Sequence, residues 1–248
     1  MIITQTRTID YFEADPVFRV KLGVLIKRLQ EAAVSHSESV GFGSRNMAGN
    51  KNAWILNRLG IDIIRWPAYL EPLTVTTWHR GSRGFMAYRD FRLSVEGEPV
   101  AVATSRWLFF DLGRKRVVKV PPETTAAYGA EDDRATDMDL DTWSPPAAPN
   151  IVTRLDISTR ASDYDPNGHV NNAVYFDYLE TLLVAETHGG DLPKRFLIQY
   201  QKEIPREVAS ISVGTGPGNT ERSFSIWGDT STYASGEIIF SPPVSGSV

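Results

Sequence analysis

The feature that most constrains the fold is an internal repeat, in which two stretches of the 248-residue chain match at an offset of 150 residues. The pair Asp15-Pro16 matches Asp165-Pro166. In each copy an apolar stripe with helical spacing follows the match. The stripes consist of Leu25, Ile26, Leu29 and Ala33 in the first copy and of Tyr175, Phe176, Leu179 and Leu183 in the second. Each copy therefore predicts a turn followed by an amphipathic helix with one buried face.

Strand-like alternation of apolar and polar residues follows each helix, over residues 73–110 and again over 195–240. Within these regions 73–75 matches 211–213, now at an offset of 138. A long helix followed by several antiparallel strands, twice over, predicts an α+β chain of two domains. We expect them at 1–129 and 151–248, with an acidic and proline-containing linker at 130–150. The tail, 241–248, is expected to be poorly ordered.

Polar side chains are concentrated in the second copy, in residues 162–172. Asp-Pro and Asn-Gly pairs predict a turn there, directly before the apolar helix. Asn171 or Asn172 is then a natural N-cap. The unpaired N–H groups of a helix N-terminus favour developing negative charge, so this turn could polarise a carbonyl.

The first copy lacks these polar residues. At the same offset Asn167 is replaced by Val17, and His169 is replaced by Arg19. The first copy is therefore expected to be non-catalytic, with a role in forming a substrate tunnel and docking a partner. Chemistry is expected in the second copy.

The motif Asp-x-Asn-x-His-Val-Asn-Asn, from Asp165 to Asn172, precedes an aromatic helix and resembles that of the acyl-acyl carrier protein (acyl-ACP) thioesterases. Its core from Gly168 to Tyr175 is also similar to the wider acyl-CoA thioesterase group. The resemblance covers nearly the whole chain. It implies two tandem hotdog domains, each a long helix wrapped by a curved antiparallel sheet, and hydrolysis of fatty acyl-ACP to free fatty acid and carrier protein.

The resemblance also implies a glutamate on a strand that faces the start of the helix. Glu203 matches it, and the repeat aligns Glu203 with Arg65. Where many plant members have cysteine, this chain has Ile204, so a Cys-His-Asn scheme cannot operate. We expect Glu203, desolvated in the fold interior, to act as general base on water, with direct nucleophilic attack as the weaker alternative.

The remaining site residues have supporting roles in this scheme. Asn167 would orient the water or the carboxylate, and His169 would position Glu203 or assist the leaving thiolate. Asp165 would hold Asn167, His169 or the turn, although related hotdog enzymes use an aspartate near this turn as the base. Backbone N–H groups near Asn171 and Asn172 would receive the oxyanion.

Composition excludes several other chemistries. The chain has no cysteine, which removes disulfides, zinc–thiolate sites and cysteine nucleophiles. None of its four histidines has the spacing of a zinc motif, so neither a metal nor another cofactor is expected. No run of eighteen apolar residues predicts a membrane span, and the first residues do not resemble a secretory signal. We expect a cytoplasmic protein.

Charge is distributed unevenly along the chain. Residues 1–129 contain 18 Lys and Arg against 12 Asp and Glu, and residues 130–248 contain 8 against 18. The carrier protein implied by the family is acidic, carries its acyl group on phosphopantetheine, and would be steered by a basic first half. The expected docking residues are Arg114, Lys115 and Arg116, with Arg80 and Arg83 next. No nucleic-acid motif accompanies the basic charge.

Two alternatives to an acyl-ACP hydrolase remain open at this point. One is an acyl-CoA thioesterase of the same fold. The other is a non-hydrolytic acyl-binding protein or a hotdog dehydratase, although a dehydratase would separate its Asp and His by more than the four positions between Asp165 and His169. The chain is expected to be a monomer or a homodimer, since one chain already contains two hotdogs.

Overall fold

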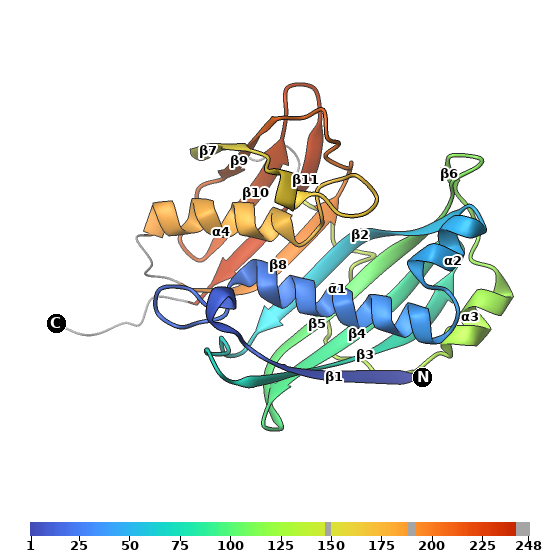
Figure 1. Ribbon diagram of the computed structural model, residues 1–248. Coiled ribbons are helices and arrows are strands. Elements are labelled where there is room, and N and C mark those ends of the chain that lie inside the picture. The colour runs from blue at the N-terminus through green and yellow to red at the C-terminus, as the bar shows by residue number, and fades with distance from the viewer. Residues whose placement is uncertain (147–149, 188–191, 242–248) are drawn as a thin grey trace. The chain divides into compact units, whose positions relative to one another are not determined.

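The computed structural model describes residues 1–146, 150–187 and 192–241. It separates into two compact units, Met1–Trp143 and Ser144–Val248. Figure 1 labels the elements of both. Residues 242–248 of the tail that the sequence predicted to be poorly ordered lie outside the described residues.

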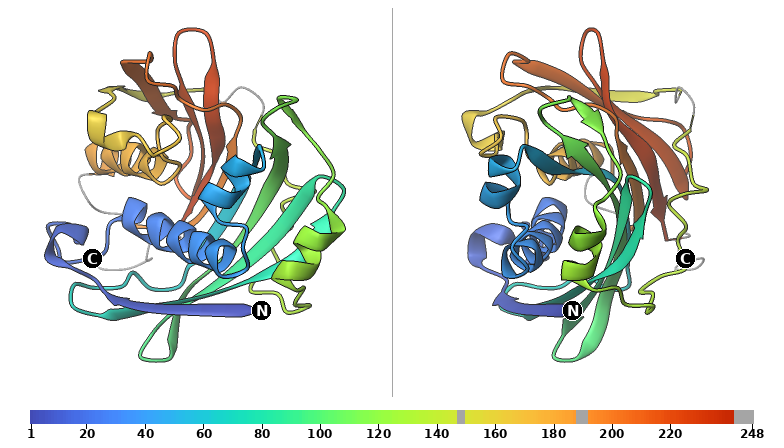
Figure 2. Two further views of the ribbon diagram at one scale, coloured as in Figure 1. Left: turned by 45° about the vertical axis from the view of Figure 1, so that its right-hand side comes forward. Right: turned by 90° about the vertical axis from the view of Figure 1, so that its right-hand side faces the viewer.

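The first unit is built on the long helix α1, Leu22–Ser39, which lies against an antiparallel sheet (Figure 1). The order of its strands is β1 (Ile2–Thr8), β3 (Pro72–Arg83), β4 (Met86–Val95), β5 (Glu98–Asp111) and β2 (Asn52–Ile63), and β6 (Arg116–Val117) pairs with β5. Shorter helices are η1 (Tyr11–Glu13), α2 (Ser44–Gly49) and α3 (Pro122–Tyr128). Figure 2 shows the sheet curving around α1. The predicted stripe of α1 is buried, which places the core of the unit between helix and sheet.

The second unit repeats this arrangement. Helix α4, Val174–Thr187, follows the short helix η2, Ala161–Asp163. The order of its strands is β7 (Thr153–Ser158), β9 (Ser210–Thr215), β10 (Glu221–Trp227), β11 (Thr232–Phe240) and β8 (Pro193–Tyr200), all antiparallel. The predicted stripe of α4 is also buried, at 7% exposure or less. The prediction of two hotdog domains, each a helix wrapped by a curved sheet, is confirmed.

Backbone hydrogen bonds confirm the internal repeat residue by residue. The N–H of Asp15 donates to the carbonyl of Arg19 at 2.7 Å, and that of Asp165 donates to the carbonyl of His169 at 2.9 Å. The N–H of Val170 donates to Ile204 at 3.0 Å. In the first copy the equivalent bond runs from the N–H of Val20 to the carbonyl of Pro67, at 2.8 Å.

These bonds correct one detail of the alignment. Ile204 occupies the place of Pro67, so Glu203 corresponds to Trp66 and not to Arg65. The strands that follow nevertheless match at the offset of 138. Arg7 on β1 pairs with Leu73, and Ile157, the residue 150 positions after Arg7, pairs with Ile211. The second copy therefore contains one additional residue just before β9.

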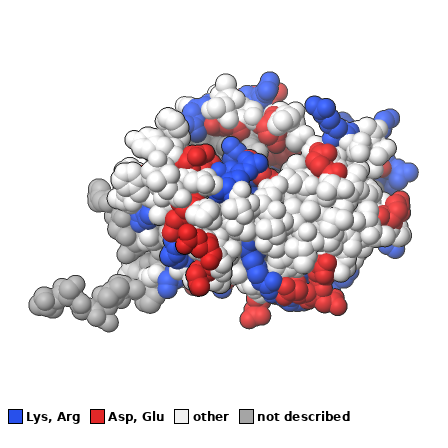
Figure 3. Space-filling model, turned by 60° about the horizontal axis from the view of Figure 1, so that its bottom comes forward, with Lys and Arg blue, Asp and Glu red and all other residues white. Residues whose placement is uncertain are grey.

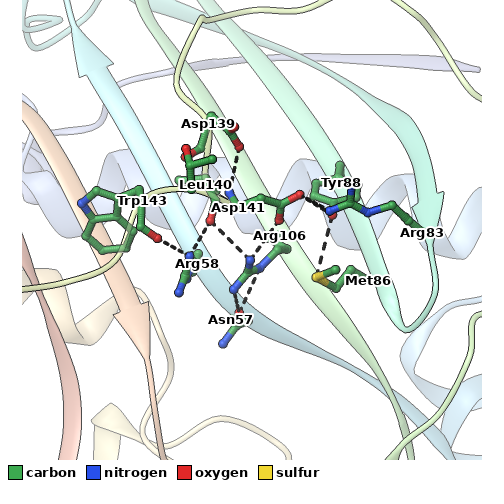
Figure 4. Close-up of polar contacts among 11 residues, drawn as sticks. Asn57, Arg58, Arg83, Met86, Tyr88, Arg106, Asp139, Leu140, Asp141 and Trp143 are labelled. Atoms are coloured by element: carbon green, nitrogen blue, oxygen red, sulfur yellow. Dashed lines mark hydrogen bonds and ion pairs between the residues drawn. The ribbon is translucent and has the colours of Figure 1, made fainter.

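The first part of the expected linker is held on the first unit. Figure 4 shows residues 139–143 lying over β2, β4 and β5. Arg106 on β5 donates to Asp141 at 2.9 Å, and Tyr88 on β4 donates to the same carboxylate at 2.9 Å. Arg58 on β2 donates to the carbonyl of Leu140 at 2.5 Å. Together these bonds fix the path of the chain as far as the end of the first unit.

Candidate active site

The turn before α4 is closed by its own backbone and by one carboxylate. Asp165 Oδ1 accepts a hydrogen bond from the N–H of Asn167 at 2.8 Å, and the Asp165 carbonyl accepts one from Gly168 at 3.0 Å. Gly168 has φ +85°, a left-handed conformation that glycine adopts without steric cost. Its place in the turn explains why an Asn-Gly pair stands here.

This turn is joined to the segment that follows β8. An isolated bridge pairs His169 with Pro205, and the Val170–Ile204 hydrogen bond lies next to it. The two segments therefore bring His169 and Glu203 together. His169 Nδ1 lies 3.2 Å from Glu203 Oε2. This contact is the central geometric feature of the site.

The chemistry of the two groups fixes how they can pair. A carboxylate only accepts hydrogen bonds, so in this contact the proton is on His169 Nδ1. In the neutral ring Nε2 then has a free lone pair. The Glu203 side chain is 58% exposed and that of His169 is 35% exposed, so both remain open to solvent and to a substrate.

Two expectations about Glu203 are corrected by its position. Strand β8 ends at Tyr200, so Glu203 follows the strand and does not lie on it. The N–H groups of Gln201 and Lys202 both donate to the carbonyl of Tyr233, at 2.8 and 3.2 Å, where the regular strand pairing ends. Beyond this point Ile204 is fully buried, and Glu203 is exposed instead of desolvated.

Asp165 and Asn167 form a second pair of site residues. Asn167 Nδ2 donates to Asp165 Oδ2 at 3.3 Å, and Asn167 itself is exposed. Within residues 150–187 and 192–241, no hydrogen bond joins this pair to the Glu203 carboxylate. The four expected catalytic residues thus form two contacting pairs on one turn and the neighbouring segment.

The start of α4 differs in part from the expected oxyanion site. Asn171 Oδ1 accepts from the N–H of Ala173 at 2.9 Å, which is a capping interaction. However, the Asn171 N–H donates to the carbonyl of Asp163 at 2.9 Å, so it is not free for an oxyanion. Within the described residues, the N–H of Asn172 has no such bond, so it is one available donor at this turn.

A buried pair of side chains, which the sequence did not predict, stabilises the turn. The Tyr178 hydroxyl donates to Asp163 Oδ2 at 2.6 Å, and Asp163 is 2% exposed. Burial and then this carboxylate raise the pKa of Tyr178, which keeps its hydroxyl protonated as a donor. The first copy has Glu13 and Arg28 at the same two positions, at 2.6 Å. This shared spacing of fifteen residues is the signal that could have revealed the pair.

The expected docking residues differ in how exposed they are and in how closely they are paired with carboxylates. Arg114, Lys115 and Arg116 are exposed at the turn between β5 and β6. Arg80 is only 15% exposed and pairs with the buried Asp90 at 3.5 Å. Arg83 is exposed but pairs with Asp141 at 2.7 Å. The β5–β6 turn is therefore the more open of the two expected surfaces.

Across the described residues, no three or more His, Asp or Glu side chains are grouped so that they could hold a metal ion. None of the helices in that part of the chain combines the length and apolarity needed to cross a bilayer.

Two antiparallel sheets in tandem, each wrapped around a long helix, define the double hotdog class of protein. The family model for the acyl-ACP thioesterase N-terminal domain matches residues 2–128, and the model for the C-terminal domain matches 147–237. The chain belongs to the acyl-ACP thioesterase family.

Individual relatives are similar at low sequence identity. An oleoyl-acyl carrier protein thioesterase 2, chloroplastic, from Arabidopsis thaliana is 25% identical over 77% of this chain and 60% of that protein. A dodecanoyl-[acyl-carrier-protein] hydrolase, chloroplastic, from Cinnamomum camphora is 26% identical over 90% of this chain and 62% of that protein. The chain thus spans about 60% of the length of these relatives.

Solved structures show the same fold along nearly the whole chain. An acyl-ACP thioesterase from Bacteroides thetaiotaomicron has a TM-score of 0.84 at 22% identity and covers 97% of this chain and 98% of its own. A 12:0-ACP thioesterase from Umbellularia californica has a TM-score of 0.84 at 21% identity and covers 97% of both chains.

Proposed function

We propose that this protein hydrolyses fatty acyl-ACP thioesters to free fatty acid and carrier protein. The observation that carries the proposal is the 3.2 Å contact between His169 and Glu203 at the start of α4, in the half that matches the family's C-terminal domain. Thioesters have an electrophilic carbonyl and a good leaving group, so a modest set of acid and base groups is sufficient.

In the proposed reaction Glu203 removes a proton from water as the water oxygen attacks the thioester carbonyl. The tetrahedral oxyanion is stabilised by the N–H of Asn172 at the helix start. When the intermediate collapses, the carbon–sulfur bond breaks and the protonated Glu203 returns its proton to the leaving thiolate. His169 positions the Glu203 carboxyl through its Nδ1 proton. The products are a carboxylic acid and the phosphopantetheine thiol.

Asn167 and Asp165 position the reacting groups in this scheme. Asn167 is exposed beside the pair and its amide orients the attacking water. Asp165 accepts from the Asn167 backbone and side chain, so it fixes the turn. The first copy supports this division, because Asp15 likewise accepts from the N–H of Val17, at 2.9 Å, on a turn without Asn167 and His169.

The two halves have different proposed roles. Residues 151–248 carry the chemistry, and residues 1–129 contribute the substrate tunnel and dock the carrier protein. Arg114, Lys115 and Arg116 are the proposed docking group, because they are exposed and close together in the β5–β6 turn. Arg80 and Arg83 are weaker candidates because their ion pairs, at 3.5 and 2.7 Å, are closer than the 3.7 Å that separates Arg114 from Asp111. A cytoplasmic location and a monomeric or homodimeric state stay predictions.

The test is the release of free thiol from matched acyl-ACP and acyl-CoA substrates of several chain lengths. We expect kcat/KM to be higher for acyl-ACP at every chain length that is hydrolysed. Equal values for the two substrates would support an acyl-CoA thioesterase instead. Absence of thiol release from all of them would contradict hydrolysis and favour an acyl-binding protein.

A further inference from the structure

An exposed group of apolar side chains surrounds the turn of the first copy. They lie on η1, on the turn that precedes α1, drawn in dark blue in Figure 1, and on the segment before β3. Phe12 is 86% exposed, and Tyr11 and Leu70 are each 65% exposed. The rings are in contact, with centroid distances of 5.5 Å between Tyr11 and Phe12 and 5.9 Å between Phe18 and Tyr69. This apolar patch consists of Tyr11, Phe12, Val17, Phe18, Tyr69 and Leu70.

The internal repeat shows that the fold does not require this patch. The same backbone hydrogen bonds hold the equivalent turn of the second copy, yet its side chains there are small or polar. In the same order, the equivalent residues are Ala161, Ser162, Asn167, Gly168, Arg206 and Glu207. One scaffold therefore carries the candidate active site in one copy and an exposed apolar surface in the other.

Backbone conformation adds a second, independent observation. Phe18 has φ +63° where the second copy has Gly168, and Leu70 has φ +70°. A left-handed conformation at a bulky residue costs on the order of 1–2 kcal/mol. Neither side chain is buried, so neither recovers this cost in the core. The strain is retained at two side chains that point to solvent, which indicates a role at the surface.

The charges around the patch exclude an acidic partner as its occupant. Three nearby carboxylates are paired with a cation of the same unit, and Asp10 and Lys21, which also flank the patch, carry opposite charges. The pairs are Asp15 with Arg19, Glu13 with Arg28 and Glu71 with Arg65, at 3.0, 2.6 and 2.8 Å. A surface without excess positive charge offers no attraction to an acidic carrier protein or to nucleic acid.

The size and chemistry of the patch favour a lipid surface over a second copy of the chain. A stable protein–protein interface takes roughly 20–30 residues from each side, far more than six. Phenylalanine rings beside tyrosine hydroxyls are instead suited to the boundary between water and lipid, where one end of the side chain is apolar and the other wet. We propose that the apolar patch docks the first unit on the interface of a lipid bilayer.

The benefit of this docking rests on the proposed function. A fatty acid that the protein releases near a bilayer can partition directly into it. The docking itself does not depend on hydrolysis. Its test is flotation of the full chain with vesicles of phosphatidylcholine alone, at low and high salt. We expect a bound fraction that salt does not reduce, since no net charge is involved.

The second copy supplies the test variant. Phe12→Ser and Phe18→Gly, made together, introduce the residues found at 162 and 168. We expect vesicle affinity to fall by about tenfold or more, because two exposed rings are removed. The melting temperature should be nearly unchanged, since glycine relieves the left-handed strain, and hydrolysis of a small water-soluble acyl thioester should also be unchanged.

Phe85→Ser is the matched control, since Phe85 is 43% exposed in the same unit but lies outside the patch. Its vesicle affinity should equal that of the unmodified chain. The proposal is overturned if the unmodified chain does not float with the vesicles, or if Phe85→Ser loses as much affinity as the double variant. A concentration-dependent dimer that the double variant abolishes would identify a second copy as the occupant.

Discussion

At the scale of single residues, the two carboxylates near the turn have separable roles. Asp165 has a counterpart, Asp15, that makes equivalent hydrogen bonds in the first copy. Its presence is therefore explained by the turn alone. Glu203 corresponds to Trp66, so the carboxylate beside His169 belongs to the second copy only. This contrast is why we assign the base to Glu203.

Replacing Glu203 with glutamine separates a base from a positioning group. Glutamine keeps an oxygen that accepts a hydrogen bond from His169, but it cannot take a proton from water. We expect Glu203→Gln and Glu203→Ala both to lower kcat by about 10²–10⁴ with folding intact. Asn167→Ala should lose on the same order.

The outcome is measured as kcat on one acyl-ACP substrate, with Asp165→Asn in parallel. If Glu203→Gln loses less than about tenfold while Glu203→Ala loses far more, Glu203 positions His169, and His169 becomes the base. If Glu203→Ala keeps more than about half of kcat, the assignment is wrong and Asp165 becomes the leading candidate.

A buried histidine in the first unit predicts a pH dependence of stability. His36 on α1 is fully buried and accepts a hydrogen bond at Nδ1 from Arg89 at 2.9 Å. Burial, and then the charge of Arg89, lower the pKa of His36 from 6.5 to about 3. In the unfolded chain His36 therefore binds a proton near pH 6.5, whereas in the native state it stays neutral until about pH 3. The free energy of unfolding consequently falls as the pH decreases from 6.5 towards 3.

His36→Asn removes this titration but keeps an acceptor for Arg89. Between pH 7.5 and 5.5 the unmodified chain should lose about 1.4 kcal/mol more free energy of unfolding than the variant. Urea unfolding at the two pH values measures the difference. Equal losses in both proteins would show that His36 is protonated in the native state.

At the scale of elements, the two turns before α1 and α4 share a backbone and differ in chemistry. Each is closed by an aspartate, and each is supported by a side chain fifteen residues further along on the helix, in the pairs Glu13–Arg28 and Asp163–Tyr178. Because each turn is supported by a pair of residues from its own copy, a change in one turn should affect only the function of that copy.

Arg19→Ala tests this independence. Arg19 occupies the position of His169 and pairs with Asp15 at 3.0 Å, with both side chains partly exposed. We expect a stability loss of no more than about 1 kcal/mol, as is typical of such pairs, and kcat within about twofold of the unmodified value. A collapse of kcat in a folded Arg19→Ala protein would show that both copies contribute catalytic groups.

At the scale of the whole molecule, charge is divided unevenly along the sequence. The first half has a net charge of +6 and the second of −10, counted over residues 1–129 and 130–248. On the face drawn in Figure 3, however, acidic and basic side chains are interspersed around broad uncharged areas. Steering of an acidic partner therefore needs a local group of exposed cations.

The β5–β6 turn provides three exposed cations, of which Arg114 lies 3.7 Å from Asp111, and charge reversal tests this turn. Changing Arg114, Lys115 and Arg116 to Glu should raise KM for acyl-ACP several-fold and reduce its salt dependence. Hydrolysis of a small acyl thioester should not change. Lys194→Glu, at an exposed position of β8, is the control. An equal loss on both substrates, or no loss on either, would remove this turn as the docking site.

The sequence determined the features that depend on local periodicity. The stripes of α1 and α4 are buried as predicted, because residues three and four apart share one face of a helix wherever that helix packs. The repeat was visible for the same reason, since each copy must bury its own stripe. Strands β1, β2 and β7 were not identified. In β1 and β7 the alternation is largely of half-buried and exposed residues, and apolar contrast is weak.

Only the tertiary structure decided how the site residues meet. Whether Glu203 lies on the strand, and whether it is buried, depends on the shared carbonyl of Tyr233, some thirty positions away along the chain. The contact of Glu203 with His169 likewise depends on the bridge between His169 and Pro205. Such pairings join segments that are far apart in the sequence, and no repeating spacing indicates which residues will pair. One inserted residue is enough to shift the register of the pairing. The motif in the sequence therefore suggested the site residues, and the pairing of distant segments decided which of them touch.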